Sequence, residues 1–168
     1  MSKITLGGKP VETSGELPKK GSIAPDFKLV AIDLSTKTLN DFSGSNLVLN
    51  IFPSVDTGVC SASVRAFNKV AADLSNTKVL CISRDLPFRQ DQFCAADGLE
   101  NVIMLSDFKN GSFGKSYGLL MTNGNFDGLL SRCVIILNNK NEVIYTEQVP
   151  EIGQEPDYES ALQALKAI

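Results

Sequence analysis

The stretch NLVLNIFPSVDTGVCSASVRAFNKVAADL, residues 46–74, indicates the fold class. Its first part, Asn46–Phe52, is almost entirely apolar and β-prone, which is typical of a strand buried on both faces of a sheet. From Cys60 to about Leu74, apolar residues recur at steps of three and four, which predicts one buried face of a helix. A buried strand followed by an amphipathic helix favours a layered α/β sheet.

The segments on either side fit the same architecture. Residues 3–12 indicate a hairpin around Gly7 and Gly8, because paired glycines tolerate the positive φ angles of a tight turn. The remaining predicted elements are an extended region at 26–34, strands at 77–85 and 101–105, a helix from Pro87 to a stop at Gly98, two strands joined by NNKN within 131–149, and a helix at 155–168 with Pro156 near its start. This order favours a mixed sheet with helices on both sides.

Length and composition limit the possible functions. The 168 residues and 43% hydrophobic content suit one domain, 1–168. The net charge is −3 and the basic residues are scattered, so we expect no nucleic acid and no membrane as partner. The longest apolar runs are far shorter than the ~20 residues of a membrane helix. The N-terminus lacks the apolar centre of a signal peptide, so we expect a cytoplasmic protein.

Four cysteines, Cys60, Cys81, Cys94 and Cys133, are the candidate reactive groups. No two of them have Cys-x-x-Cys spacing and the chain has no histidine, so we expect neither a metal nor another cofactor. The lack of histidine also excludes Cys-His and Ser-His-Asp catalysis. Another group must therefore activate any nucleophile.

Cys60 is predicted in the first turn of a helix, at the carboxyl end of a central strand. There, unpaired backbone N–H groups and the helix dipole favour a thiolate. Thr57 supplies a hydroxyl, Pro53 stiffens the loop, and a fixed arginine would complete the electrostatics. The same residues also fit simpler roles: Cys60 in packing, Thr57 or Asp56 as a helix cap, and Pro53 as a strand terminator.

These residues together resemble a known family. PSVDTGVC fits the Pro-x-x-x-Thr-x-x-Cys signature of peroxiredoxins, and NIFPSVDTGVCSASVRAFN is similar to the thiol peroxidase subfamily, of the atypical two-cysteine type. The similarity continues through LCISRDLPFRQDQFCAADGLENVIMLS and EIGQEPDYESALQALKA. It implies a thioredoxin-like mixed sheet flanked by helices, with an added N-terminal β-hairpin.

The resemblance also implies residue roles. Cys60 matches the peroxidatic cysteine, and Pro53, Thr57 and Arg132 match the residues around it. Cys94 matches the resolving cysteine. The implied activity is reduction of hydrogen peroxide and alkyl hydroperoxides through a Cys60 sulfenic acid, an intramolecular Cys60–Cys94 disulfide and recycling by thioredoxin, in a homodimer. Joining the two sulfurs requires Cα atoms closer than ~7 Å, so we expect FCAADG, residues 93–98, to unwind if they lie farther apart.

The other candidates are assigned by position. Cys81 lies in a predicted buried strand and fits an apolar role. Cys133 follows Arg132 directly, so the alternation of a strand sends it to the opposite face, into the core. Arg132 by itself also fits a surface charge. A set of apolar residues either forms a collar around Cys60 or belongs to ordinary core and loops: Phe52, Phe88, Phe93, Tyr117 and residues 118–130.

Two other classes share the expected fold. A general disulfide reductase places a Cys-x-x-Cys pair at this helix, whereas Cys60 is followed by Ser61-Ala62-Ser63, which counts against that class. A non-enzymatic domain in which Cys60 is only a redox sensor stays open. Consumption of hydroperoxide distinguishes an enzyme from such a sensor.

Overall fold

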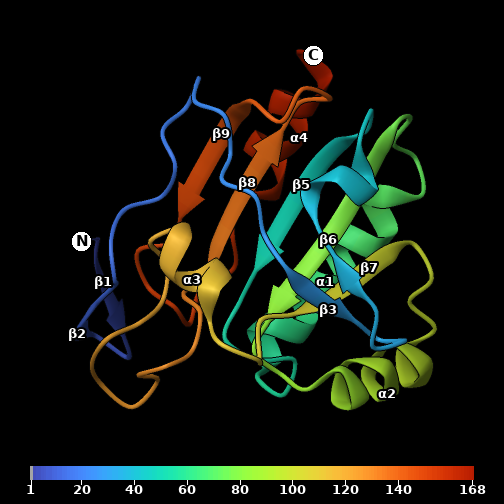
Figure 1. The fold of residues 1–168 in the computed structure, drawn as a ribbon. Coiled ribbons are helices and arrows are strands. Elements are labelled where there is room, and N and C mark those ends of the chain that lie inside the picture. The colour runs from blue at the N-terminus through green and yellow to red at the C-terminus, as the bar shows by residue number, and fades with distance from the viewer. Residues whose placement is uncertain (1) are drawn as a thin grey trace.

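The computed structural model describes residues 2–168, and a seven-stranded mixed sheet forms its centre (Figure 1). The strands are β3 (Leu29–Ala31), β4 (Thr36–Lys37), β5 (Asn46–Ile51), β6 (Thr77–Ser83), β7 (Val102–Ser106), β8 (Cys133–Leu137) and β9 (Val143–Gln148). Their order across the sheet is β4-β3-β7-β6-β5-β8-β9. β5, β6 and β7 are parallel, whereas β8 lies antiparallel to β5. The carboxyl end of β5 therefore adjoins the amino end of β8.

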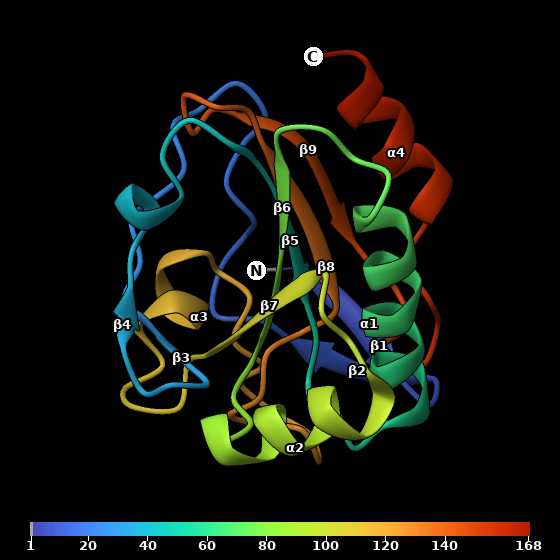
Figure 2. The ribbon, with the colours of Figure 1, turned by 90° about the vertical axis from the view of Figure 1, so that its right-hand side faces the viewer.

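Helices cover both faces of the sheet. They are α1 (Gly58–Ala71), α2 (Pro87–Asp97), α3 (Ser112–Ser116) and α4 (Tyr158–Lys166), with a 3-10 turn η1 (Leu39–Phe42). Figure 2 shows α1 and α4 on one side of the sheet and α3 on the other. Among residues 2–168, no helix has the length and apolar character needed to cross a membrane.

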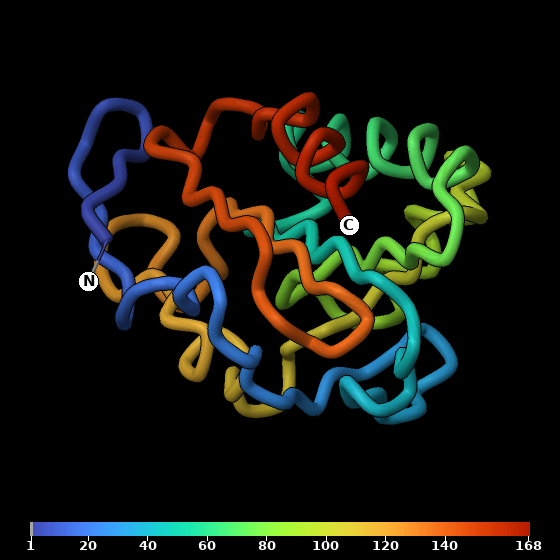
Figure 3. The backbone as a smooth tube through the Cα atoms, turned by 90° about the horizontal axis from the view of Figure 1, so that it is seen from above, coloured from blue at the N-terminus to red at the C-terminus, as the bar shows by residue number. Residues whose placement is uncertain are grey.

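The N-terminal hairpin is a separate two-stranded sheet, β1 (Lys3–Leu6) and β2 (Lys9–Glu12). Gly7 and Gly8 form its turn with φ angles of 59° and 77°, which glycine adopts without the steric cost of a side chain. Ile4 and Val11 pack against Met121 and Ile152 in a small hydrophobic cluster. Figure 3 shows the hairpin at one end of the molecule and α2 at the other.

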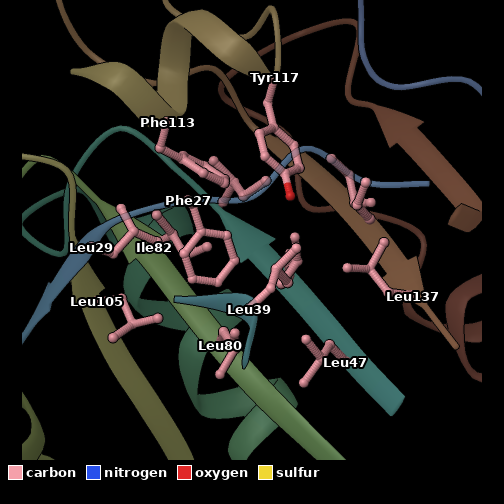
Figure 4. Packing of buried hydrophobic residues seen from close by; sticks show 14 of the residues in the cluster. Phe27, Leu29, Leu39, Leu47, Leu80, Ile82, Leu105, Phe113, Tyr117 and Leu137 are labelled. Carbon is pink, nitrogen blue, oxygen red and sulfur yellow. The ribbon is translucent and has the colours of Figure 1, made fainter. Parts of the chain in front are cut away.

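The central strands contribute to two cores because their side chains alternate between the faces. On β5, Leu47, Leu49 and Ile51 enter the core on the α3 side, whereas Val48 enters the core on the α1 side. Figure 4 shows the α3-side core, where Phe113 and Tyr117 point from α3 and its end toward the sheet. These strands are therefore buried on both faces, as their continuous apolar runs predict.

The structure confirms the predicted mixed α/β sheet, the hairpin and the long helices. α1 begins at Gly58, two residues before the predicted start at Cys60, and ends at Ala71, three residues before the predicted end near Leu74. α2 has Pro87 in its first turn and ends at Gly98, whose φ of 62° closes the helix in the left-handed conformation. The short elements α3, β4 and η1 were not predicted, because two to five residues give no readable periodicity.

Candidate active site

The loop between β5 and α1 places Cys60 in the first turn of α1. Thr57 is the N-cap residue of this helix, with extended backbone angles, and Cys60 is fully buried at the carboxyl edge of the parallel strands. The first backbone N–H groups of a helix have no intrahelical acceptor, so they present a positive potential to a sulfur at this position. Crevices at this edge commonly form the sites of open α/β sheets.

Arg132 lies directly against Cys60. Its Nη2 donates a hydrogen bond to Cys60 Sγ over 3.1 Å, and its Nε donates to the carbonyl of Ile152 over 2.8 Å. The arginine is only 2% exposed. Its Nη1 has no hydrogen-bond partner among residues 2–168, so one buried donor remains available to an acceptor that enters the site. The geometry excludes the reading of Arg132 as a surface charge.

Strand alternation accounts for the placement of Arg132. Cys133, the first residue of β8, pairs with Ile51 of β5 and lies in the α3-side core. Arg132 immediately precedes it and therefore points to the opposite face, where Cys60 packs in the α1-side core. Cys133 instead contacts Ser131 and Gln148, and burial raises the pKa of its thiol to about 12.

Thr57 and Pro53 belong to the same loop. The Thr57 hydroxyl donates to the carbonyl of Ser54 over 3.2 Å and makes no capping bond to the helix. Because its proton is used in this bond, the hydroxyl oxygen can accept a hydrogen bond from a bound molecule. Pro53 is buried directly after Phe52, where its ring restricts the loop.

A mostly apolar cavity of about 140 Å³ opens beside the Cys60–Arg132 pair. Its lining residues come from the start of α1, the hairpin, the loop at Phe126 and the segment after β9: Leu6, Thr57, Gly58, Val59, Phe126, Arg132, Ile152 and Gly153. A larger depression of about 750 Å³ lies at the opposite end of the sheet, near Asn46 and Thr77, and its lining includes neither Arg132 nor any residue of the loop before Cys60. The smaller cavity is lined by Arg132, the residue that contacts the Cys60 sulfur.

Only some of the apolar residues that were candidates for a collar around Cys60 line this cavity. Phe126 lines it, whereas Phe52 and Phe93 are buried in the α1-side core. Phe88 is 63% exposed on α2. Tyr117 lies on the other face of the sheet, where its hydroxyl donates to the carbonyl of Pro25 over 2.7 Å.

Cys94 lies in the last turn of α2 and is half-buried against the α1-side core. Burial, with the nearby carboxylates of Asp91 and Asp97, raises the pKa of its thiol to about 11. Cys94 therefore stays a thiol at neutral pH while α2 is folded. All four cysteines, each within residues 2–168, have free thiols. Cys81 is fully buried on β6, as its apolar role predicts.

Asp85 is a structural part of the site that sequence reasoning missed. Its carboxylate accepts hydrogen bonds from the Ser54 hydroxyl over 2.7 Å, the Val55 amide over 2.9 Å and the Ser83 hydroxyl over 2.6 Å. It thereby ties the loop that carries Thr57 to the end of β6. The available clue was that Ser54 and Asp85 follow two predicted strands whose carboxyl ends meet at one edge of the sheet.

Two ion pairs join α2 to α1 and the preceding loop. Arg89 of α2 contacts Asp56 over 2.6 Å, and Arg65 of α1 contacts Asp97 at the end of α2 over 2.8 Å. The hydrogen bond from Arg89 lowers the pKa of Asp56, which is thus an ion-pair partner and not a helix cap. Both pairs therefore tie the helix that carries Cys94 to the region around Cys60.

Known proteins share this sequence and this fold. The redoxin family model matches residues 19–162. A thiol peroxidase of Corynebacterium glutamicum is 50% identical over 165 residues, which are 98% of this chain and 99% of the relative. A peroxiredoxin-like protein from Aquifex aeolicus is 34% identical, with a TM-score of 0.93 over 99% of this chain and 97% of the other.

A thiol peroxidase from Chromobacterium violaceum has the same fold, with a TM-score of 0.91 at 24% identity over 98% of this chain and 95% of the other. These similarities agree with the thioredoxin-like sheet and the added hairpin expected from the sequence. The family model covers most of the chain, and the relative at 50% identity covers nearly all of it. The chain therefore belongs to the redoxin family and, within it, to the peroxiredoxins of the thiol peroxidase subfamily.

Proposed function

We propose that this protein is a thiol-dependent peroxidase that reduces hydrogen peroxide and alkyl hydroperoxides, with Cys60 as the nucleophile. The observation that carries the proposal is the 3.1 Å hydrogen bond from Arg132 to Cys60 Sγ in a buried site. A guanidinium and a helix N-terminus both stabilise negative charge on the sulfur. They perform the activation that histidine provides in other thiol enzymes.

In the first step, the Cys60 thiolate attacks the terminal oxygen of the hydroperoxide. The O–O bond breaks as the S–O bond forms, giving Cys60 sulfenic acid and an alkoxide or hydroxide that takes a proton to leave as alcohol or water. The unpartnered Arg132 Nη1 supplies a donor for the oxygen that gains charge. The Thr57 oxygen accepts the hydroperoxide O–H and orients it.

The cavity beside Cys60 supports alkyl hydroperoxides as substrates. Its walls are formed largely by Leu6, Val59, Phe126 and Ile152, which suit an apolar substituent. Hydrogen peroxide needs none of these contacts, because it presents only oxygen atoms to Thr57 and Arg132. The preferred substrate thus depends on the cavity walls, while the chemical step depends on the polar residues.

In the second step, the Cys94 sulfur attacks the Cys60 sulfenic acid, forming the disulfide and releasing water. The raised pKa of Cys94 disfavours this reaction in the folded helix. We expect that unwinding of the last turn of α2 exposes the half-buried thiol to the sulfenic acid. Two features favour this opening: α2 has no basic residue in its last turn, and Asp97 faces the negative end of the helix dipole.

Recycling requires a dithiol reductant, and by family membership we expect thioredoxin, which reduces the disulfide by thiol–disulfide exchange. The homodimer, the cytoplasmic location and the single domain 1–168 stay predictions from the sequence. A non-enzymatic redox sensor is the alternative function. It would form the same sulfenic acid but would not turn over.

Peptide mapping of oxidised protein tests the assignments. Wild-type protein treated with one equivalent of hydrogen peroxide should yield a Cys60–Cys94 disulfide, and thioredoxin with its reductase should sustain hydroperoxide consumption. Cys60→Ser should abolish consumption, and Cys94→Ser should accumulate sulfenic acid at Cys60. Cys133→Ala is the matched control and should keep both the disulfide and the turnover.

Different outcomes contradict different parts of the proposal. Activity in Cys60→Ser would remove Cys60 as the nucleophile. A Cys60–Cys133 disulfide, or no disulfide, would remove Cys94 as the resolving residue. Disulfide formation without turnover, in the presence of thioredoxin and of dithiothreitol, would favour the redox sensor.

A further inference from the structure

Glu151 binds the turn of the N-terminal hairpin. Its Oε1 accepts hydrogen bonds from the amides of Gly7 and Gly153, over 3.0 and 3.1 Å. Its Oε2 accepts from the Thr5 hydroxyl over 2.6 Å and from the Gly8 amide over 3.1 Å. Each carboxylate oxygen thus has two donors, and three of the four come from the hairpin. Within residues 2–168, Glu151 is the one residue whose side chain accepts hydrogen bonds from both glycines of the turn.

The segment that carries Glu151 also supports the site around Cys60. Ile152, the next residue, accepts the hydrogen bond from Arg132 Nε with its carbonyl. The backbone of this segment also pairs with the hairpin. The Thr5 amide donates a hydrogen bond to the Pro150 carbonyl, and the Ile152 amide donates one to the Thr5 carbonyl. The hairpin, the cavity and the arginine are therefore connected through three consecutive residues.

The hairpin forms one wall of the cavity. Leu6 at the end of β1 lines it together with Thr57 and Val59, which lie just before and within the first turn of α1, and with Phe126 and Ile152. Leu6 also packs onto the small cluster that includes Ile152. The position of this wall therefore depends on how firmly the hairpin is attached, and Glu151 provides the side-chain attachment at the adjacent turn.

Glu151 acts here as a fixed anion and not as an acid or base. The hydrogen bond from Thr5, followed by those from the amides of Gly153, Gly8 and Gly7, lowers the pKa of Glu151 to about 2. The carboxylate is therefore ionised at every pH at which the enzyme would work. The contact persists as a charge-assisted one.

We propose that Glu151 is a positioning residue that holds the N-terminal hairpin as the apolar wall of the cavity and thereby determines the preference for alkyl hydroperoxides over hydrogen peroxide. This inference rests on the peroxidase function proposed above. An alkyl substituent gains contact with Leu6 only while the hairpin is attached. Hydrogen peroxide does not reach that wall, so its reaction is independent of the hairpin.

Steady-state kinetics of two variants test this role. Glu151→Gln keeps the shape but puts an amide NH₂ against two of the four donors, and Thr5→Val removes the shortest hydrogen bond. For each protein, kcat/KM is measured with cumene hydroperoxide and with hydrogen peroxide, using dithiothreitol as reductant. Glu142→Gln is the matched control, because Glu142 accepts a side-chain hydrogen bond from Asn138 at the far end of β8.

We expect kcat/KM for cumene hydroperoxide to fall about tenfold in Glu151→Gln and by a smaller factor in Thr5→Val, while the value for hydrogen peroxide stays near that of wild type. Hydrogen exchange at the amides of Gly7 and Gly8 should accelerate in the same variants. Glu142→Gln should change neither the ratio of the two kcat/KM values nor the rate of hydrogen exchange at Gly7 and Gly8. Circular dichroism checks that each variant folds. If Glu151→Gln does not fold, Thr5→Val tests the same attachment, because it removes a hydrogen bond to Glu151.

Two results would overturn the proposal. One is an unchanged ratio of the two kcat/KM values despite faster exchange at the turn. The other is an equal loss with both substrates, which would assign Glu151 to the support of Arg132 through Ile152. If wild-type protein consumes neither hydroperoxide, the proposed peroxidase function fails instead, so the two failures are distinguishable.

Discussion

The guanidinium of Arg132 lies 3.1 Å from the sulfur of Cys60, although 72 residues separate them in the chain. The contact forms because β8 is antiparallel to β5, which brings the residue before β8 next to the loop after β5. The carbonyl of Ile152 fixes the arginine by accepting a hydrogen bond from its Nε. A buried, oriented cation is thus available to the thiol without any histidine.

Replacing Arg132 should slow the reaction of Cys60 with hydroperoxide. Arg132→Met removes the charge and all three donor nitrogens, and we expect the second-order rate constant with hydrogen peroxide to fall about a hundredfold or more. Arg132→Lys keeps a charge without the fork of donors and should retain part of the rate. Rapid-quench measurement of sulfenic acid gives the constants. A wild-type rate in Arg132→Met would contradict the role of the guanidinium.

Weakening the two ion pairs should accelerate disulfide formation. Arg89→Ala and Arg65→Ala each remove an exposed or partly exposed ion pair between α2 and the region of Cys60, and solvent screens such pairs. We expect the step from sulfenic acid to disulfide to run about two- to fivefold faster, because the opening of α2 becomes easier. High ionic strength should have a similar effect on wild type and a smaller one on each variant, which keeps one of the two pairs.

Rapid quench with alkylation of free thiols follows this step after one equivalent of hydrogen peroxide. Lys140→Ala, which removes an exposed cation at the turn between β8 and β9, is the control and should behave as wild type. Slower disulfide formation in Arg89→Ala would mean that the pairs guide Cys94 to Cys60 and do not restrain it.

Asp85→Asn should reduce activity with both kinds of hydroperoxide. The variant keeps the shape but weakens the two hydrogen bonds that hold the loop at Ser54 and Val55 and the one that ties Asp85 to Ser83. The Ser54 carbonyl in turn positions the Thr57 hydroxyl. We expect about a tenfold loss of kcat/KM for each substrate, with no change in their ratio. The control Asp33→Asn alters a carboxylate that binds Ser35 at an exposed turn. A selective loss with one substrate would argue against this role.

Alkaline pH should destabilise the folded protein through its buried thiols. Burial raises the pKa of Cys81 from 9.0 to about 12, so the folded state keeps a proton that the unfolded state releases. Stability from this group is complete below about pH 9 and is lost as the pH rises toward 12. Cys133, whose pKa is also raised to about 12, acts in the same direction.

Urea unfolding under reducing conditions at about pH 8 and about pH 10.5 measures this loss. Cys81→Ala should lose less free energy of unfolding between the two pH values than wild type, because it lacks the Cys81 thiol, which releases a proton on unfolding at the higher pH. Ile82→Val truncates the neighbouring position of β6 without removing a titrating group, so it should lose as much as wild type. Equal losses in all three proteins would exclude the linkage at Cys81.

The sequence predicts the parts of this structure that depend on local pattern. The apolar run of β5, the periodicity of α1 and the alternation at Arg132 and Cys133 follow from residues close together in the chain. The contacts that hold the site in place, by contrast, cannot be predicted from local sequence. Glu151 binds Gly7 across 144 residues, and Asp85 binds Ser54 across 31, so neither contact has a local pattern that indicates it. Their recognition requires the folded topology.

The distance in sequence between Cys60 and its partners has a consequence for synthesis. Chains emerge from the ribosome with the N-terminal end first and begin to fold during elongation. A nascent chain that already displays Cys60 lacks Arg132, Glu151 and Ile152, so its thiol has neither the guanidinium nor the closed cavity. The proposed nucleophile therefore meets its guanidinium and the carbonyl that orients it only after residues 132–152 have been synthesised.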